Sequence, residues 1–434
     1  MTLFLSASDP GFEAAFQTLL AAKREDHADV DEIVAGIIAD VRRRGDAALL
    51  DLTSKFDRLS LTPETMAFSA TEIDAECHKV SFQDRQALEL AAARIRDYHL
   101  RQMPLDQSWT DSNGAMLGWR WTAVASAGLY VPGGLASYPS SVLMNAIPAA
   151  VAGVKRLVIC APTPGGICNP MVLLAARLAG VETMYRIGGA QAIAALAYGT
   201  ETIAAVDKIT GPGNAYVAAA KRRVFGHVGI DMIAGPSEVL VIADRHNDPD
   251  WIALDLLSQA EHDESAQSIL ITDDADLARG VAAAVERHLP GLERQAIARA
   301  SWQKNGAVIV VGSLAQAAEL SDRIAPEHLQ LCVEDADGLA NMVSHAGAIF
   351  LGAWTPEAIG DYVGGPNHVL PTARSARFSS GLSVLDFLKR TTLAKMTPAA
   401  LRAIGPAGER LAKSEGLQAH GQSIRLRLDR NSAT

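Results

Sequence analysis

The stretch AGLYVPGG (residues 127–134) starts the pattern that decides the fold. Its first five residues predict a short buried strand, which runs into a Pro-Gly-Gly turn. Helix-length and strand-length segments then alternate, with strands expected over 156–161, 183–187, 206–210 and 228–232 and helices over 140–154, 170–179, 190–198 and 215–225. Strands separated by helices of this length predict a parallel sheet wound by right-handed crossovers.

A second alternating series has strands over 238–243, 268–272, 307–311, 329–333 and 348–352. We therefore predict an α/β chain with two doubly wound Rossmann-like lobes, the first inserted in the second, plus a helical N-terminal arm and a helical C-terminal tail domain. Residues up to about 103 are expected to be mostly helical, with helices over 12–22 and 82–103, a helical pair over 30–56 divided near Gly45, and a strand over 66–70. Asn113-Gly114 predicts a tight hairpin within 109–124, and only helix is expected from 381 to 416.

Composition excludes several classes of protein. The 434 residues are 49% hydrophobic and carry a net charge of −10, which argues for a large core and against nucleic-acid binding. No apolar run predicts a membrane span, and the N-terminus lacks the basic region of a secretion signal. The four cysteines show no CxxC spacing, which indicates a reducing compartment and predicts a cytoplasmic protein. Cys332 follows apolar strand positions, so a buried side chain is favoured over a nucleophile.

Two glycine turns lie between predicted strands and helices, at Gly188-Gly189 and over 211–214. Glycine lets backbone N–H groups approach a phosphate at a helix N-terminus, and Tyr130, Gln191 and Asn214 would lie near these crevices. Asp231 even stands about twenty residues after the second turn, as a dinucleotide fingerprint expects. However, Tyr216 occupies the place of the third glycine, and tight turns are common in any α/β protein.

A possible metal site begins in the segment 251–266, whose apolar residues recur at helical spacing. Gln259 and His262 follow Leu256 at intervals of three, so an amide oxygen and an imidazole would share one line of a helix. Taken alone, this pair is better explained as a helix end that turns polar. Asp361 and His420 could complete a site of nitrogen and oxygen donors suited to zinc or manganese, but spacing cannot bring the four together.

Glu327 and His328 place a carboxylate beside an imidazole just before a predicted strand. A Glu can activate water and a His can transfer protons near neutral pH. Taken by itself, the pair is better explained as a surface Glu with a half-buried His. His368, in a glycine-rich loop after Asp361, is a second imidazole in the same part of the chain.

Taken together, the segments resemble the histidinol dehydrogenase family in order and over nearly the whole chain beyond residue 120. The matching stretches are GLYVPGG (128–134), SSVLMNAIPAAVAGV (140–154), GGAQAIAALAYGTE (188–201), DKITGPGNAYV (207–217), DMIAGPSEVLVIAD (231–244), LLSQAEHD (256–263), APEHLQL (325–331), DYVGGPNHVLP (361–371) and EGLQAHGQSI (415–424).

The resemblance implies oxidation of L-histidinol to L-histidine through L-histidinal with two NAD, the last step of histidine biosynthesis, by a homodimer with one Zn2+ per subunit. It implies metal ligands at Gln259, His262 and Asp361 of one subunit and at His420 in the tail of the other. The water-activating Glu falls on Glu327 and the acid/base His on His328. Substrate contacts fall on the four metal ligands and on Ser237, His328, His368 and Glu415, and cofactor contacts on Tyr130, Gln191 and Asn214.

The resemblance also implies a division of labour along the chain. Residues 1–25 would be the arm, 26–129 with 239–380 the metal and substrate lobe, 130–238 the cofactor lobe, and 381–434 the dimerisation tail. Three alternatives stay open: a related zinc dehydrogenase for another polar alcohol such as a sulfonated diol, a non-catalytic α/β ligand-binding protein, and a zinc hydrolase.

Overall fold

The computed structural model describes residues 2–22, 28–133, 138–233 and 235–430. These residues form two compact units, one from Met1–Arg101 and Ala125–Phe387 and one from Gln102–Val124 and Leu388–Thr434. Parts of several predicted features lie outside the described residues: Gly134 of the first turn, residues 1 and 23–25 of the arm, residues 26–27 of the metal and substrate lobe, residues 134–137 and 234 of the cofactor lobe, and residues 431–434 of the tail.

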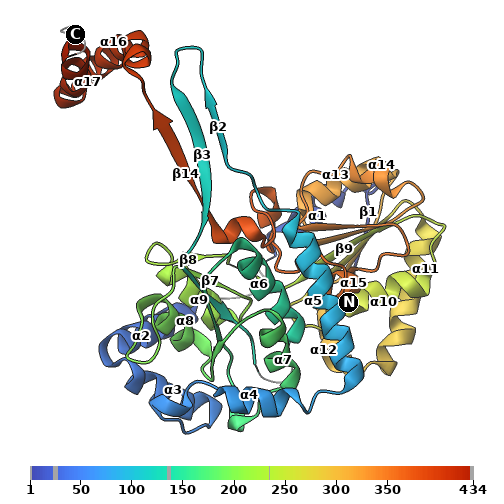
Figure 1. The fold of residues 1–434 in the computed structure, drawn as a ribbon. Helices are drawn as coiled ribbons and strands as arrows, with labels where there is room; N and C mark the ends of the chain where they lie inside the picture. Colours follow the sequence, from blue (N-terminus) through green and yellow to red (C-terminus); the bar gives the residue numbers. More distant parts are fainter. Residues whose placement is uncertain (1, 23–27, 134–137, 234, 431–434) are drawn as a thin grey trace. The chain divides into compact units, whose positions relative to one another are not determined.

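The first lobe of the larger unit is a five-stranded parallel sheet in the order β6-β5-β4-β7-β8. The strands are β4 (Ser126–Tyr130), β5 (Arg156–Cys160), β6 (Thr183–Tyr185), β7 (Lys208–Thr210) and β8 (Gly229–Ile230). The chain therefore starts in the middle, moves outward to β6 and returns to the other side of β4. This reversal is a doubly wound topology, and ligands of such sheets bind where the order reverses. The connecting helices are α6 (Pro139–Ala152), α7 (Pro170–Leu178), α8 (Gly189–Tyr198) and α9 (Ala215–Val224). Figure 1 labels β7 and β8 and the helices α6 to α9 of this lobe.

The second lobe repeats this winding in a six-stranded parallel sheet, β1-β11-β10-β9-β12-β13. Its strands are β9 (Glu238–Ala243), β10 (Gln267–Thr272), β11 (Ala307–Val310), β12 (His328–Cys332), β13 (Ala348–Leu351) and β1 (Leu3–Ser6), which extends the sheet beside β11. Its helices are α10 (Pro249–Ala260), α11 (Ala275–His288), α12 (Gln295–Asn305), α13 (Leu314–Ile324), α14 (Ala336–Ala340) and α15 (Glu357–Tyr362). The predicted class, two doubly wound lobes, is confirmed.

The N-terminal helices cover both lobes. They are α1 (Phe12–Ala21), α2 (Ala28–Arg44), α3 (Asp46–Asp57), α4 (Ala70–Cys77) and α5 (Phe82–Leu100). Val34, Ile38 and Val41 of α2 share one apolar core with α8, whereas Phe12 and Phe16 of α1 are buried in the core of the second lobe. The helical pair predicted over 30–56 is confirmed, with its break at Gly45.

The strand predicted over 66–70 is wrong. Ala67 makes an isolated bridge to Tyr185, and Ser69 already caps α4, because its hydroxyl accepts a hydrogen bond from the Glu72 N–H. Ser69 and Glu72 form a capping box, the local signal for a helix start.

The smaller unit contains an antiparallel sheet, β14-β3-β2, and two C-terminal helices. Its elements are β2 (Gln107–Thr110), β3 (Met116–Ala123), β14 (Leu388–Lys395), α16 (Pro398–Ser414) and α17 (Gln418–Arg430). The predicted hairpin forms at Asn113-Gly114, where Gly114 has a φ of +81°. The purely helical chain predicted after 381 is wrong, because β14 pairs with β3 along all eight of its residues.

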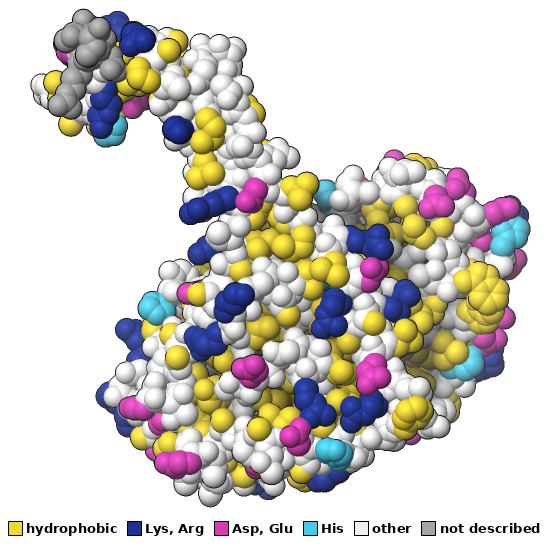
Figure 2. Space-filling view, in the orientation of Figure 1, with side chains coloured by type: hydrophobic (Ala, Val, Ile, Leu, Met, Phe, Trp, Pro, Cys, Tyr) yellow, Lys and Arg dark blue, Asp and Glu magenta, His cyan; other side chains and the backbone are white. Residues whose placement is uncertain are grey.

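Within the described residues, no helix is long and apolar enough to cross a membrane. On the face drawn in Figure 2, acidic and basic side chains of the larger unit are interspersed with apolar ones. No broad field of one charge gathers on the described residues of that face.

Candidate functional site

Helix α10 brings Gln259 into the interior. Asp248 caps its start by accepting a hydrogen bond from the Asp250 N–H, and Pro249 occupies the first turn. Leu256, Gln259 and Ala260 are buried at the other end. The helix ends at Ala260, so His262 lies in the turn that follows, with its N–H donating to the Gln259 carbonyl. The predicted helical line through Leu256, Gln259 and His262 is therefore broken before His262, which is exposed.

The Glu327–His328 couple lies at the amino end of β12 and is buried. The two side chains are held by the backbone of Glu238 on the neighbouring strand β9: its N–H donates to Glu327 Oε2 at 2.9 Å, and its carbonyl lies 3.0 Å from His328 Nδ1. A carbonyl only accepts, so Nδ1 carries the proton and the neutral ring presents Nε2 as a lone pair. His328 is the first residue of the strand, one residue before the predicted start at Leu329.

Asp361 approaches this couple from α15. Its carboxylate lies 3.4 Å from His368 Nδ1, and His368 Nε2 lies 3.3 Å from the Ser141 hydroxyl. Ser141 belongs to α6 of the first lobe, whereas Glu327, His328 and Asp361 belong to the second. The site is therefore built where the two lobes of the larger unit meet.

The charges of the site influence one another. Burial raises the pKa of Glu327 well above its usual range, with the Glu238 N–H opposing and the Glu238, Asp361 and Glu357 carboxylates reinforcing the rise. Burial lowers the pKa of His328. Burial would also raise the pKa of Asp361, but the hydrogen bond and charge of His368, with the charges of His328 and His262, lower it instead. Asp361 is thus an ionised carboxylate among imidazoles, and His262, His368 and the couple lie in one electrostatic neighbourhood.

Glu357 is a site residue that the sequence reasoning missed. Its buried carboxylate lies 3.6 Å from His328 Nε2, beyond hydrogen-bond range, and burial raises its pKa. One ligand atom from each of His328, Glu357 and Asp361 lies within 4.8 Å of the others. The spacing of Glu357 and Asp361, four residues apart on one helical face, was the available signal.

The donors present fit a divalent cation. Nε2 of the buried Gln259 amide makes no hydrogen bond within the described part of the chain. A buried polar atom without a partner is costly unless a ligand completes it. Rotating the Gln259 amide by 180° would place its oxygen at the unpartnered position. Together with Asp361 and His262, this amide oxygen would give nitrogen and oxygen donors of the kind that zinc binds.

The two glycine turns, Gly188-Gly189 and 211–214, lie near Tyr130 at the carboxyl ends of the strands of the first lobe. The Tyr130 hydroxyl accepts a hydrogen bond from the Gly189 N–H at 3.1 Å, and burial raises its pKa to about 12. Gln191 is buried in α8 beside this turn, and Asn214 is exposed at the start of α9, which it caps. The fingerprint interpretation of Asp231 is wrong: its carboxylate is buried against Lys221 and accepts the Gly211 N–H, so it cannot reach a ribose.

The remaining predicted residues lie as follows. Ser237 immediately precedes Glu238 at the start of β9, and its carbonyl accepts the Gln267 N–H. Glu415 ends α16 and His420 lies on α17, both exposed and both in the smaller unit, so their part in the site stays a prediction. Cys332 is buried, and burial raises its pKa to about 12, which agrees with an apolar role rather than a nucleophilic one.

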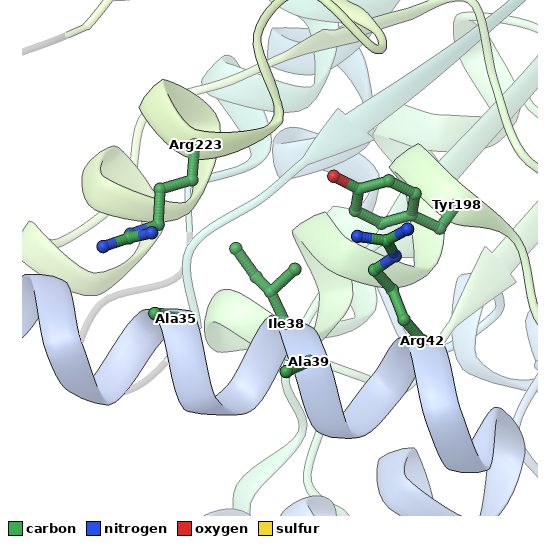
Figure 3. Close-up of a pocket in the computed structure, with 6 residues that line it drawn as sticks. All are labelled: Ala35, Ile38, Ala39, Arg42, Tyr198 and Arg223. Atoms are coloured by element: carbon green, nitrogen blue, oxygen red, sulfur yellow. The ribbon is translucent and has the colours of Figure 1, made fainter.

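A separate hollow of about 250 Å³ lies between α2 and the helices α8 and α9 (Figure 3). Its two guanidinium groups already have partners: Arg42 lies over the Tyr198 ring at 4.5 Å, and Arg223 pairs with Asp31 at 2.6 Å. None of the predicted site residues lines it.

The fold and this geometry define a class of protein: an α/β enzyme with a buried acid–base couple beside a carboxylate–imidazole cluster, at the meeting of two doubly wound lobes. Comparison with known proteins agrees. The family model described as histidinol dehydrogenase matches residues 20–428. A relative from Cereibacter sphaeroides named histidinol dehydrogenase is 74% identical, and one from Ruegeria pomeroyi with the same name is 72% identical, each over 99% of both chains.

A solved structure is also similar over the whole length. The crystal structure of histidinol dehydrogenase from Elizabethkingia anophelis has a TM-score of 0.95 and 37% identity, covering 99% of both chains. The chain therefore belongs to the histidinol dehydrogenase family and is an oxidoreductase of amino-acid biosynthesis. The predicted family is confirmed, and the alternative of a non-catalytic binding protein is excluded.

Proposed function

We propose that this chain oxidises L-histidinol to L-histidine through L-histidinal, using two NAD, as the last step of histidine biosynthesis in the cytoplasm. The observation that carries the proposal is His328, whose Nδ1 proton is committed to a backbone carbonyl while its buried Nε2 has no hydrogen-bond partner among the described residues. An unprotonated imidazole nitrogen in this position is suited to take a proton from an alcohol.

One Zn2+ per subunit would be held by Gln259, His262 and Asp361, with the partner subunit's His420. When bound, it would orient the imidazole and amine of the substrate and polarise its oxygen. The ionised state of Asp361 and the unpartnered amide of Gln259 support this assignment. Ser237, His368 and Glu415 would contact the substrate, and the homodimer follows from a ligand set that spans two subunits.

The chain's own residues would divide the two oxidations. In the first, His328 Nε2 takes the hydroxyl proton as hydride leaves carbon for NAD. In the second, Glu327 takes a proton from water as the water adds to the aldehyde, and the resulting hydrate gives hydride to the second NAD. Glu327 must be ionised for this role; burial raises its pKa and disfavours that form, and the hydrogen bond from the Glu238 N–H opposes this effect only in part.

NAD would bind at the carboxyl ends of β4 and β7, against Tyr130, Gln191 and Asn214. Open α/β sheets bind ligands at this edge, where the strand order reverses. On this basis the sheet β6-β5-β4-β7-β8 would belong to the cofactor lobe and the sheet β1-β11-β10-β9-β12-β13 to the metal and substrate lobe, and residues 381–434 would supply the dimerisation tail.

The test is to count NADH formed per L-histidinol consumed, with and without a chelator. We expect two NADH per substrate, loss of turnover with the chelator, and recovery with zinc. A ratio of one, or turnover that resists metal removal, would contradict the proposal. Faster turnover of a sulfonated diol than of histidinol would point to the related dehydrogenase instead.

A further inference from the structure

A buried ion pair holds the second glycine turn by its backbone. Asp231, after β8, accepts the Gly211 N–H at 2.8 Å, and Lys221, on α9, donates to the Gly211 carbonyl at 3.0 Å. The two charges are in contact with each other, and their side chains are only 1% and 3% exposed. The N–H and the carbonyl of Gly211 are therefore both fixed by the Lys221–Asp231 ion pair.

The position held by the pair is a demanding one. Gly211 has a φ of +119°, a conformation that other residues rarely adopt, and a Cβ there would overlap the carbonyl oxygen of Tyr130. Three residues later, the Asn214 side chain accepts hydrogen bonds from the N–H groups of Tyr216 and Val217 and starts α9. The fixed Gly211 therefore sets the spacing between Tyr130 and Asn214 across the crevice.

Stability alone gives little reason for such a pair. Removing two charges from water costs about as much as their attraction returns, and apolar residues of similar volume often serve as well. A buried ion pair therefore contributes mainly when it specifies one arrangement of the groups around it. The arrangement specified here is a backbone turn rather than a side-chain contact.

We propose that Lys221 and Asp231 are positioning residues for the cofactor: they hold the 211–214 turn in the conformation that binds the dinucleotide. This inference rests on the proposed function, because it takes the crevice beside Tyr130 and Asn214 as the NAD site. Neither residue touches the cofactor, and neither takes part in proton or hydride transfer.

The test replaces the pair by the neutral double variant Lys221→Met/Asp231→Asn in the full-length, zinc-loaded protein. The amide oxygen that this variant carries at position 231 can still accept the Gly211 N–H, and no unpaired charge is left buried. We expect the KM for NAD to rise about tenfold, the effect of losing the Lys221 hydrogen bond to the Gly211 carbonyl. The kcat at saturating NAD, the KM for histidinol and the zinc content should stay within about twofold of their original values.

Two further measurements separate positioning from general stability. Arg223→Gln is the matched control, since it breaks an ion pair on the same helix that is partly exposed and distant from the turn; its KM for NAD should not change. Amide hydrogen exchange should be faster over 211–217 in the double variant and unchanged in the control. If the double variant does not fold, Lys221→Gln/Asp231→Asn, which keeps a shorter donor, should still raise the KM at least threefold.

An NAD KM within twofold of the original in a folded double variant would overturn the inference. So would a fall in kcat and in thermal stability without a change in the KM for NAD, because that pattern is a purely structural effect. If the unaltered protein formed no NADH from histidinol, the proposed function would fail instead, and the exchange measurement would still decide whether the pair holds the turn.

Discussion

The carboxyl group of Asp255 offers a direct measure of burial on α10. It is partly buried one turn before Gln259, and it accepts a hydrogen bond from Gln330 Nε2 at 2.7 Å. Burial raises its pKa to about 6 from a usual 3.8, and the Gln330 bond opposes the rise only in part. Asp255→Asn keeps the shape and the acceptor but removes the charge, so we expect the variant to be the more stable protein at neutral pH.

The size of the gain follows from the pKa. The rise in the Asp255 pKa from 3.8 to about 6 corresponds to about 3 kcal/mol, and screening of a partly exposed group reduces this to about 1–2 kcal/mol. A raised folded-state pKa favours the neutral form, so its stabilising effect is fully present below pH 3.8 and is lost as the pH rises through about 6. The variant does not suffer this loss, so its advantage should grow between these two pH values and then stay constant.

The assay is denaturant unfolding followed by circular dichroism from pH 4 to 8, with both proteins metal-free and at equal concentration. Asp250→Asn, on the same helix, is the control with the opposite sign. Its exposed carboxylate bonds to Arg287 and His288, which lower its pKa, so the unaltered protein should be the more stable one at neutral pH and the gap should close in acid. Parallel pH curves for Asp255→Asn and the unaltered protein would refute the reasoning.

Three other outcomes are expected. Glu327→Gln should slow aldehyde oxidation by about 100-fold or more while alcohol oxidation falls less than about tenfold, as measured with each substrate separately; equal losses would reject its assignment to water. His420→Ala and Asp361→Ala should each lose bound zinc, and mixing the two chains should restore about a quarter of the sites in a dimer that shares ligands; no recovery would place the site within one chain. Gly211→Ala should lower the free energy of unfolding by about 3 kcal/mol, against about 1 kcal/mol for Gly226→Ala, because both have positive φ but only the first new methyl group meets backbone; similar losses would show that the turn can relax.

Much of the fold was predictable because each lobe is periodic. Apolar strands alternating with helices were visible from residue 127 onward, and β9 and β10 begin within one residue of their predicted starts. Strands that depend on distant partners were not predictable. β1 has four residues, two of them exposed, and is a strand because it pairs with β11; β14 likewise depends on β3, more than 260 residues away.

The candidate site was predictable in its residue types but not in its arrangement. The Glu327–His328 couple and Asp361 carry their chemistry in the sequence, whereas their closeness depends on the register of β9 against β12 and on the packing of α15. Glu357 was missed because a single Glu at the start of a helix is usually explained by its favourable interaction with the helix dipole. Asp231 misled for the opposite reason: its distance from Gly211 matched a known fingerprint, but its side chain turns inward.

The backbone contacts of Glu238 with Glu327 and His328 determine which substitutions at position 238 the site can accept. Both contacts come from the main chain, one from the N–H and one from the carbonyl, so almost any amino acid at 238 would preserve them. Proline is the exception, because it has no N–H to offer Glu327. Most substitutions at position 238 should therefore leave the orientation of Glu327 and His328 unchanged. A harmful substitution there would act by removing the Glu238 side chain, which accepts a hydrogen bond from the Ala373 N–H.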